Sequence, residues 1–233
     1  MIKKELIDNI ENIFSSKMFE CETESGETLM CSINEAFDEF HENGHNCLGC
    51  NLQGQAGLIS SFLSSADSYY SEIHFFTVYN MLLYLLTERI LEIKKIIGLP
   101  QGYKENEFSV FREIKLWANF LKHPKAFILT HHPRYVFEGE LLPKEIAEIK
   151  KYIQLDYLKK YYSGEDKNKY KVLVRELRNN ENVVVELPNL ERLTNEFCEA
   201  CRVFINVIKE NKAYKEILND LTTLENFYED YEI

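Results

Sequence analysis

Hydrophobic residues recur at helical spacing along most of the chain. In residues 2–15, for example, Ile2, Leu6 and Ile10 lie one turn apart with polar residues between them, which is the pattern of a helix that buries one face. The same periodicity predicts helices over six further ranges, which are 66–97, 107–122, 143–162, 167–178, 189–209 and 214–228. Helix is therefore the expected state of most of the chain.

The range 66–97 gives the strongest of these helices. Its middle is apolar nearly all round, which is typical of the central helix of a bundle. Two lysines followed by Gly98 and Pro100 form a stop signal at its end. Its longest apolar run, Phe75–Leu86, is well short of the roughly 20 residues that a bilayer-spanning helix needs.

Three segments depart from the helical pattern. Residues 47–57 hold glycines at 49, 54 and 57, which predict a loop or a loosely started helix. Residues 126–138 look extended around a His-His-Pro-Arg turn, and the β-branched run 182–187 is the best candidate to pair with them. The predicted fold is therefore all-α or mainly α: a helical bundle with a long central helix and a small two- or three-strand β element near 126–138 and 182–187.

Composition favours a single mainly helical domain over residues 1–233, with its C-terminal helices in 143–230. Hydrophobic residues make up 45% of the 233, enough for a sizeable core, and the 9 Gly and 5 Pro are few for a β protein of this length. The first residues read as a helix and not as a signal peptide, so we expect a cytoplasmic protein without a membrane partner. In that reducing compartment the 6 Cys are not expected to form a disulfide framework.

Charge singles out the segment Arg112–Arg134. The formal net charge of −11 argues against a general nucleic-acid coat protein. Residues 111–135 invert that balance, because they carry five bases and one acid, Glu113, together with three of the 6 His. The bases are Arg112, Lys115, Lys122, Lys125 and Arg134, and the histidines are His123, His131 and His132. Cations neutralise phosphates and an imidazole can move protons near pH 7, so the segment is the predicted phosphate-binding site.

Within this segment, the run Trp117–Pro124 (WANFLKHP) resembles the nuclease-associated motif of HEPN-domain proteins. The family pattern is an Arg, a polar residue that is often Asn, a short spacer and a His. Asn119 and His123 match the polar residue and the His, while Ala118 stands in the place of the Arg. The resemblance covers about residues 66–125. HEPN domains are all-helical, usually dimeric bacterial domains, and many are toxins or abortive-infection factors that cut RNA.

The resemblance implies a homodimeric protein of a bacterial antiviral defence or toxin–antitoxin system that acts on RNA or a nucleotide. As an enzyme it would be a metal-independent endoribonuclease, with His123 as the acid/base and Asn119 as its orienting partner. The Ala at position 118 implies instead a degenerate relative that binds RNA or a nucleotide without cutting it. Both versions stay open at this point.

Two CxxC pairs, at 47–50 and 198–201, are the remaining chemical signals. Two histidines precede the first pair, and thiolates with imidazoles at such spacing can hold a structural zinc ion. The four ligands of that site would be His41, His45, Cys47 and Cys50. The second pair falls within the predicted helix 189–209, where both thiols are expected to act as small buried hydrophobes.

Two simpler interpretations compete with the RNA-directed one. A run of charges on a helix is usually a solvated face, and long basic side chains often only cover the core. The other functional class is a non-catalytic helical interaction protein, such as an adaptor or immunity protein. In such a protein the same 112–134 segment would bind a protein partner.

Overall fold

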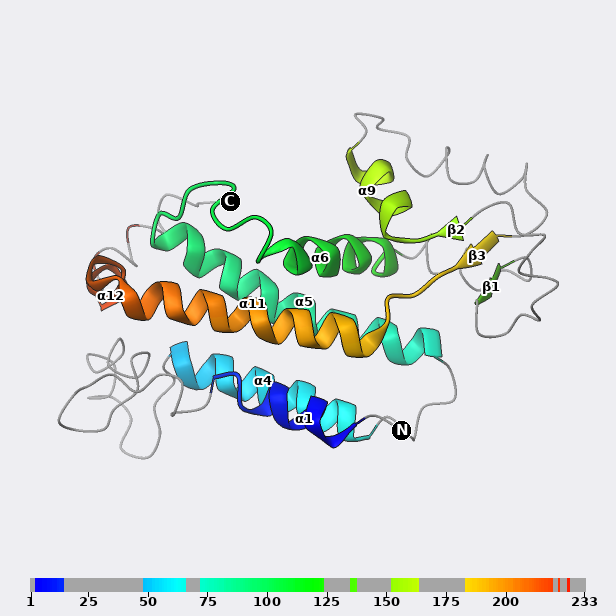
Figure 1. The fold of residues 1–233 in the computed structure, drawn as a ribbon, viewed down its shortest axis with the longest axis horizontal. Coiled ribbons are helices and arrows are strands. Elements are labelled where there is room, and N and C mark those ends of the chain that lie inside the picture. Colours follow the sequence, from blue (N-terminus) through cyan, green and yellow to red (C-terminus); the bar gives the residue numbers. More distant parts are fainter. Residues whose placement is uncertain are drawn as a thin grey trace.

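The structure is a computed structural model in which most described residues are helical. It describes residues 3–14, 48–65, 72–123, 135–137, 152–163 and 183–219, together with 222 and 226. Five helices form a bundle along the long axis of the molecule (Figure 1). They are α1 (Lys4–Glu11), α4 (Leu48–Ser64), α5 (Glu72–Ile96), α6 (Ser109–Leu121) and α11 (Leu190–Glu210). The prediction of a mainly α fold with a long central helix is confirmed.

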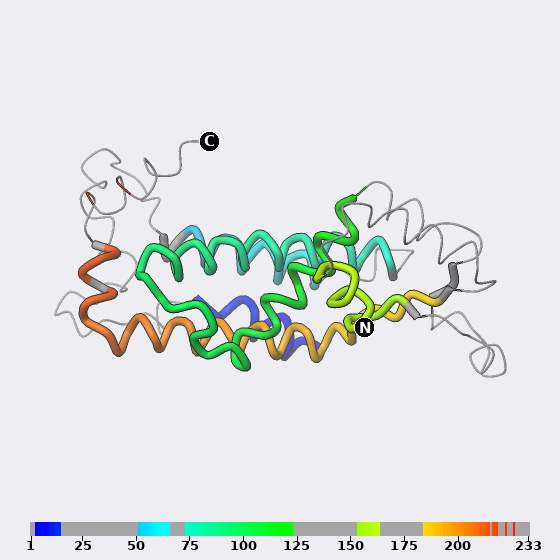
Figure 2. Tube along the Cα trace, turned by 90° about the horizontal axis from the view of Figure 1, so that it is seen from above, coloured from blue at the N-terminus to red at the C-terminus, as the bar shows by residue number. Residues whose placement is uncertain are grey.

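The core of the bundle lies between α5, α6 and α11. Helix α5 packs against both α4 and α6, and α11 packs against both α1 and α6, an arrangement that Figure 2 shows from above. The largest fully buried side chains are mostly aromatic and come from these three helices: Trp117, Tyr79, Phe111, Phe120, Phe197 and Phe204. Burying so much aromatic surface is the main driving force for this packing.

Helix α5 ends where the stop signal predicted. The N–H of Gly98 donates to the carbonyl of Lys95 (2.9 Å), and the N–H of Leu99 donates to that of Lys94 (3.0 Å). This pair of bonds is a Schellman motif, which needs a left-handed residue, and Gly98 supplies it with a φ of 67°. The chain then turns through residues 98–108 and returns along α5 as α6.

Of the two alternatives predicted for residues 47–57, the loop was wrong for the described part of that range and the helix holds, because α4 is helical from Leu48 onward. One stripe of α4 is fully buried, and it consists of Leu52, Ala56, Ile59 and Leu63. Each glycine within a helix costs about 1 kcal/mol relative to alanine. Burying this stripe against the neighbouring helices α1 and α5 outweighs that cost.

A small parallel sheet closes one end of the bundle, beside α9 (Leu155–Ser163) (Figure 1). Its strands are β1 (Tyr135–Phe137), β2 (Tyr152–Ile153) and β3 (Val183–Val185), in the order β1-β3-β2. The predicted pairing of 182–187 with 126–138 is confirmed, since Tyr135 lies opposite Val183. The single helix predicted over 143–162 was wrong, because Ile153 pairs with Val185 and is buried there before α9 begins.

The last described helix, α12 (Lys212–Asn219), lies at the opposite end of the bundle and follows directly on α11. The helix predicted over 167–178 lies outside the described residues. Within the described ranges, the structure contains no helix whose length and apolar character would let it cross a bilayer.

Candidate phosphate-binding site

The described cations of the predicted site lie on the outer face of α6. Arg112, Lys115 and Lys122 are exposed, Asn119 is half-buried, and His123 is exposed just beyond the end of the helix. Steps of three or four residues place Arg112, Lys115, Asn119 and Lys122 one turn apart, and His123 follows Lys122 directly. The opposite side of α6 carries the buried aromatic residues of the core, so burial of that side turns the polar residues outward. These five residues are called the α6 basic face below.

Two of the three cations have partners on α5. The Lys115 ammonium lies 3.0 Å from a Glu88 carboxylate oxygen, and the Lys122 ammonium lies 5.2 Å from the centroid of the Tyr84 ring. Both lysines are exposed, and exposed ion pairs contribute only about 0–1 kcal/mol. Both side chains therefore remain able to bind a phosphate group.

Asn119 and His123 are separated by one helical turn at the C-terminal end of α6. The helix ends at Leu121, and the N–H of Lys122 donates to the carbonyl of Ala118 (2.9 Å). His123 is exposed, so its imidazole can reach a ligand from solvent. A buried His123 would have had only a packing role.

Ala118, which occupies the position of the family Arg, has none of its surface exposed. It lies on the core side of α6 between two other fully or almost fully buried residues, Trp117 and Phe120. A side chain at position 118 is therefore buried, whereas that of His123 is exposed.

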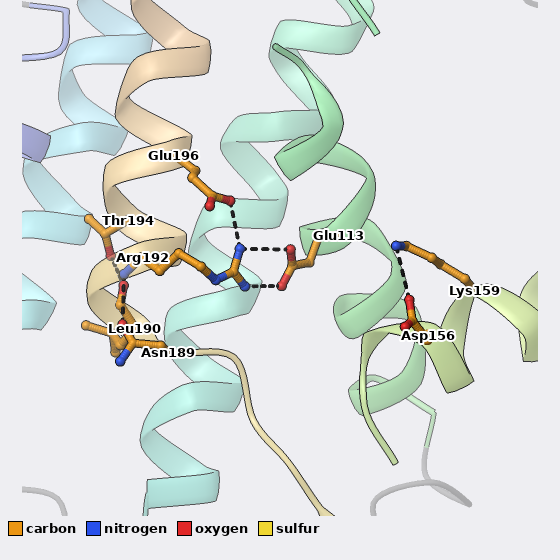
Figure 3. A network of polar contacts seen from close by, with 8 residues as sticks. All are labelled: Glu113, Asp156, Lys159, Asn189, Leu190, Arg192, Thr194 and Glu196. Atoms are coloured by element: carbon orange, nitrogen blue, oxygen red, sulfur yellow. Dashed lines mark hydrogen bonds and ion pairs between the residues drawn. The ribbon is translucent and has the colours of Figure 1, made fainter. Parts of the chain in front are cut away.

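The single acid of the segment, Glu113, is almost fully buried and is neutralised by Arg192 of α11 (Figure 3). The guanidinium donates two bonds to the Glu113 carboxylate, at 2.6 and 3.2 Å, and a third to Glu196 at 2.7 Å. Bonding to Glu113 is the main reason that the pKa of Arg192 is raised. The solvent-facing side of α6 therefore carries cations without an acid of its own.

Sequence reasoning missed Arg192, whose partner Glu113 is 79 positions away. Its four-residue spacing to Glu196 could have indicated a helical ion pair. The start of α11 at 189–190 was predicted, and the Asn189 side chain caps it by accepting from the N–H of Arg192 at 2.9 Å. The cap fixes the first turn of α11 and hence the place of Arg192.

Beside the basic face lies a groove of about 810 Å³, called the α6 groove below. It is lined by residues of α5, α6, α9, α11 and the 98–108 turn. Arg112 and Lys115 belong to its lining, and so does Lys94 of α5. No motif in the sequence indicated this groove, because the lining comes from five separate segments.

Several predicted ligands lie outside the described residues. They are Lys125, His131, His132 and Arg134 of the basic segment, and His41, His45 and Cys47 of the zinc site. Cys50 lies in the first turn of α4. No cluster of three or more His, Cys, Asp or Glu suited to a metal ion occurs within the described ranges. The zinc site at 41–50 stays a prediction.

The second CxxC pair is part of the core. Cys198 and Cys201 are both free thiols on α11 with no exposed surface, as the sequence predicted. Burial raises the pKa of the Cys198 thiol to about 12, and burial likewise raises the pKa of Cys201. At pH 8 almost none of either thiol is the reactive thiolate.

We therefore expect these two thiols to resist modification in the folded protein. In a variant with the other four cysteines replaced by serine, the thiol reagent DTNB at pH 8 should react at least about 100-fold more slowly than in urea, because reaction requires opening of the core. The serine substitutions are at Cys21, Cys31, Cys47 and Cys50. Equal rates in buffer and in urea would contradict the burial of this pair.

Comparisons of the chain with known protein families, with curated proteins and with solved structures find no match in any of the three.

Proposed function

We propose that this protein binds RNA through its phosphate backbone, with the α6 basic face as the contact surface. The observation that carries the proposal is the division of charge on α6: its cations face solvent, while its acid, Glu113, is buried against Arg192. Arg112 and Lys122 are ten residues apart, or about 15 Å along an α-helix. Cations spread over this length can contact successive phosphates of one strand.

We propose that the protein binds RNA without cutting it, as a degenerate HEPN-like member of a bacterial defence or toxin system. His123 and Asn119 are placed to contact a sugar or phosphate group. A paired Arg at position 118 would point into the core, because Ala118 is fully buried. Without that pairing, His123 has no neighbouring guanidinium on its own helix turn to stabilise a phosphate transition state.

The double variant Lys115→Gln/Lys122→Gln tests the proposal. We expect wild-type protein to bind a short single-stranded poly(U) oligonucleotide, with an affinity that falls steeply as salt rises. Each lost phosphate contact lowers the slope of log K against log salt by about 0.7 for a single strand, so the double variant should lower it by about 1.4. Fluorescence anisotropy over a range of salt concentrations measures this slope.

The matched control is Lys4→Gln/Lys212→Gln, which removes the same charge from exposed positions of α1 and α12. It should leave the slope unchanged. A wild-type protein that does not bind the oligonucleotide at low salt would contradict the proposal. Cleavage by the wild type that is lost in His123→Ala would also contradict it, and would instead support a metal-independent endoribonuclease.

The other functional class, an adaptor or immunity protein that binds a protein partner through 112–134, stays a prediction. Homodimer formation, which the HEPN resemblance implies, also stays one. The oligonucleotide assay distinguishes the adaptor or immunity protein from an RNA-binding protein. If the surface binds only a protein partner, the salt dependence of poly(U) binding should not change in Lys115→Gln/Lys122→Gln.

A further inference from the structure

The α6 groove has the size of a small-molecule site. Its volume of about 810 Å³ falls within the roughly 300–1,000 Å³ that is typical of ligand pockets. Its lining combines apolar and aromatic residues, among them Phe108 and Leu155, with a larger number of charged ones, which suits a ligand that has both an apolar and a charged part. A bare inorganic ion would leave most of this space unfilled, so the groove suits a larger organic ligand.

Five cations line the groove, and three of them already have acidic partners. Arg192 bonds Glu113 and Glu196, Lys159 lies 3.3 Å from Asp156, and Lys115 lies 3.0 Å from Glu88. The remaining two are Lys94 and Arg112. In the described part of the chain, no ion pair joins either of them to an acid.

Lys94 and Arg112 both line the groove near the beginning of α6. The Lys94 ammonium is 3.9 Å from the centroid of the Phe108 ring, and Arg112 follows Phe108 by four residues, about one turn. Partial burial lowers the pKa of Lys94. Two cations in one groove that form no ion pair with a described acid, one of them partly desolvated, favour the binding of an anion there.

The beginning of α6 strengthens the positive potential at this point. The helix has no acidic residue in its first turn, and no side chain caps it. Its N-terminal end carries a partial positive charge, which adds weakly to that of Arg112 and favours an anion nearby. Three acids line the groove, and Arg192 pairs with two of them, Glu113 and Glu196. The third, Glu105, is exposed and forms no ion pair with a described residue.

An aromatic residue lines the same groove as these cations. Tyr103 is half-buried there, with part of its ring packed against the core. It lies in a turn with Gly102 at a φ of 81° and Lys104 at a φ of 47°. A flat ligand group in the groove can pack against the part of the Tyr103 ring that lines it.

We propose that the α6 groove binds a small aromatic phosphomonoester, with Lys94 and Arg112 contacting the phosphate and Tyr103 contacting the ring. The doubly charged phosphate suits two cations that line one groove, and Arg112 can contact it through two parallel hydrogen bonds. The proposal does not rest on RNA binding, because Lys94 and Tyr103 lie outside the α6 basic face.

Calorimetric titration with phenyl phosphate tests the proposal. We expect the wild type to bind phenyl phosphate at least about tenfold more tightly than inorganic phosphate or glycerol 3-phosphate, since only the first offers a ring to the groove. Lys94→Gln and Arg112→Gln should each weaken binding by about tenfold or more, as expected for loss of a charged hydrogen bond. Tyr103→Ala should weaken phenyl phosphate binding but not inorganic phosphate binding.

The matched control is Lys95→Gln, which removes an exposed charge next to Lys94 that lies beside Glu92 on the same helix. It should bind as the wild type does. The proposal is overturned if wild-type protein does not bind phenyl phosphate, if inorganic phosphate binds equally well, or if Lys94→Gln has no effect in a variant whose thermal unfolding is unchanged. Lys94→Gln should leave the salt dependence of poly(U) binding unchanged, because Lys94 lies outside the α6 basic face. The RNA-binding proposal and the phosphomonoester proposal can therefore fail independently of each other.

Discussion

Ala118→Arg, the substitution that restores the HEPN-like arginine, is expected to destabilise the fold by at least about 3 kcal/mol and not to create a ribonuclease. Ala118 has no exposed surface and follows the fully buried Trp117. A guanidinium there must either stay buried without a partner or push the helices apart. Burying an unpaired charge costs several kcal/mol, and overpacking a core adds about 1–3 kcal/mol.

Urea unfolding followed by tryptophan fluorescence measures this loss, because Trp117 is the sole tryptophan and is buried. The matched control is Ala213→Arg, the same change at an exposed position of α12, which should stay within about 0.5 kcal/mol of the wild type. A stable Ala118→Arg protein that cuts RNA would show that position 118 opens to solvent. It would restore the catalytic version of the HEPN resemblance.

Arg192→Met is expected to destabilise the protein by about 2–3 kcal/mol, because it leaves the buried Glu113 carboxylate without its cationic partner. The Glu113 side chain is only 7% exposed, and Arg192 donates two hydrogen bonds to its carboxylate. Removing one partner of a buried ion pair costs about 3–5 kcal/mol. The lower figure applies here because the Arg192 side chain is 40% exposed, which admits water to the vacated site.

A double-mutant cycle separates this effect from simple loss of packing. The pair Glu113→Leu/Arg192→Met removes both charges and should recover much of the stability lost in Arg192→Met, because no buried carboxylate remains unpaired. Arg202→Met is the control, since Arg202 pairs with the exposed Glu199 on the same helix at 3.2 Å and should cost less than about 1 kcal/mol. Equal losses for Arg192→Met and Arg202→Met would mean that the Glu113 pair is no stronger than a surface pair.

Most of the helices could be predicted from the local pattern of hydrophobic residues and from capping signals in the sequence. The end of α5 and both bounds of α11 were predicted closely, because each helix has a strong terminal signal: Gly98 in a left-handed conformation after α5, and the Asn189 cap at the start of α11. Where the expectation was wrong, long-range packing decided. Residues 48–64 are helical despite their glycines, since α1 and α5 cover the Leu52 stripe, and Ile153 is in a strand because β3 supplies its hydrogen bonds.

The candidate site was predictable only in its chemistry. The count of charges identified the α6 segment, and the four-residue step from Asn119 to His123 placed these two on one face of a helix. Counting could not show that Glu113 points inward or that Ala118 does, because the side to which each residue turns depends on which helices cover α6. The α6 groove was beyond local reasoning for the same reason, as five segments form it.

The sequence by itself therefore determined that this protein is mainly helical, and that a segment with five bases and one acid begins on the helix that follows the long central one. Periodicity and capping act over a few residues and are visible in the chain. The tertiary structure alone decided that Arg192 neutralises Glu113, that the family arginine position lies in the core, and that Lys94 and Arg112 share a groove. Each of these depends on how the helices pack against one another, which no local pattern shows.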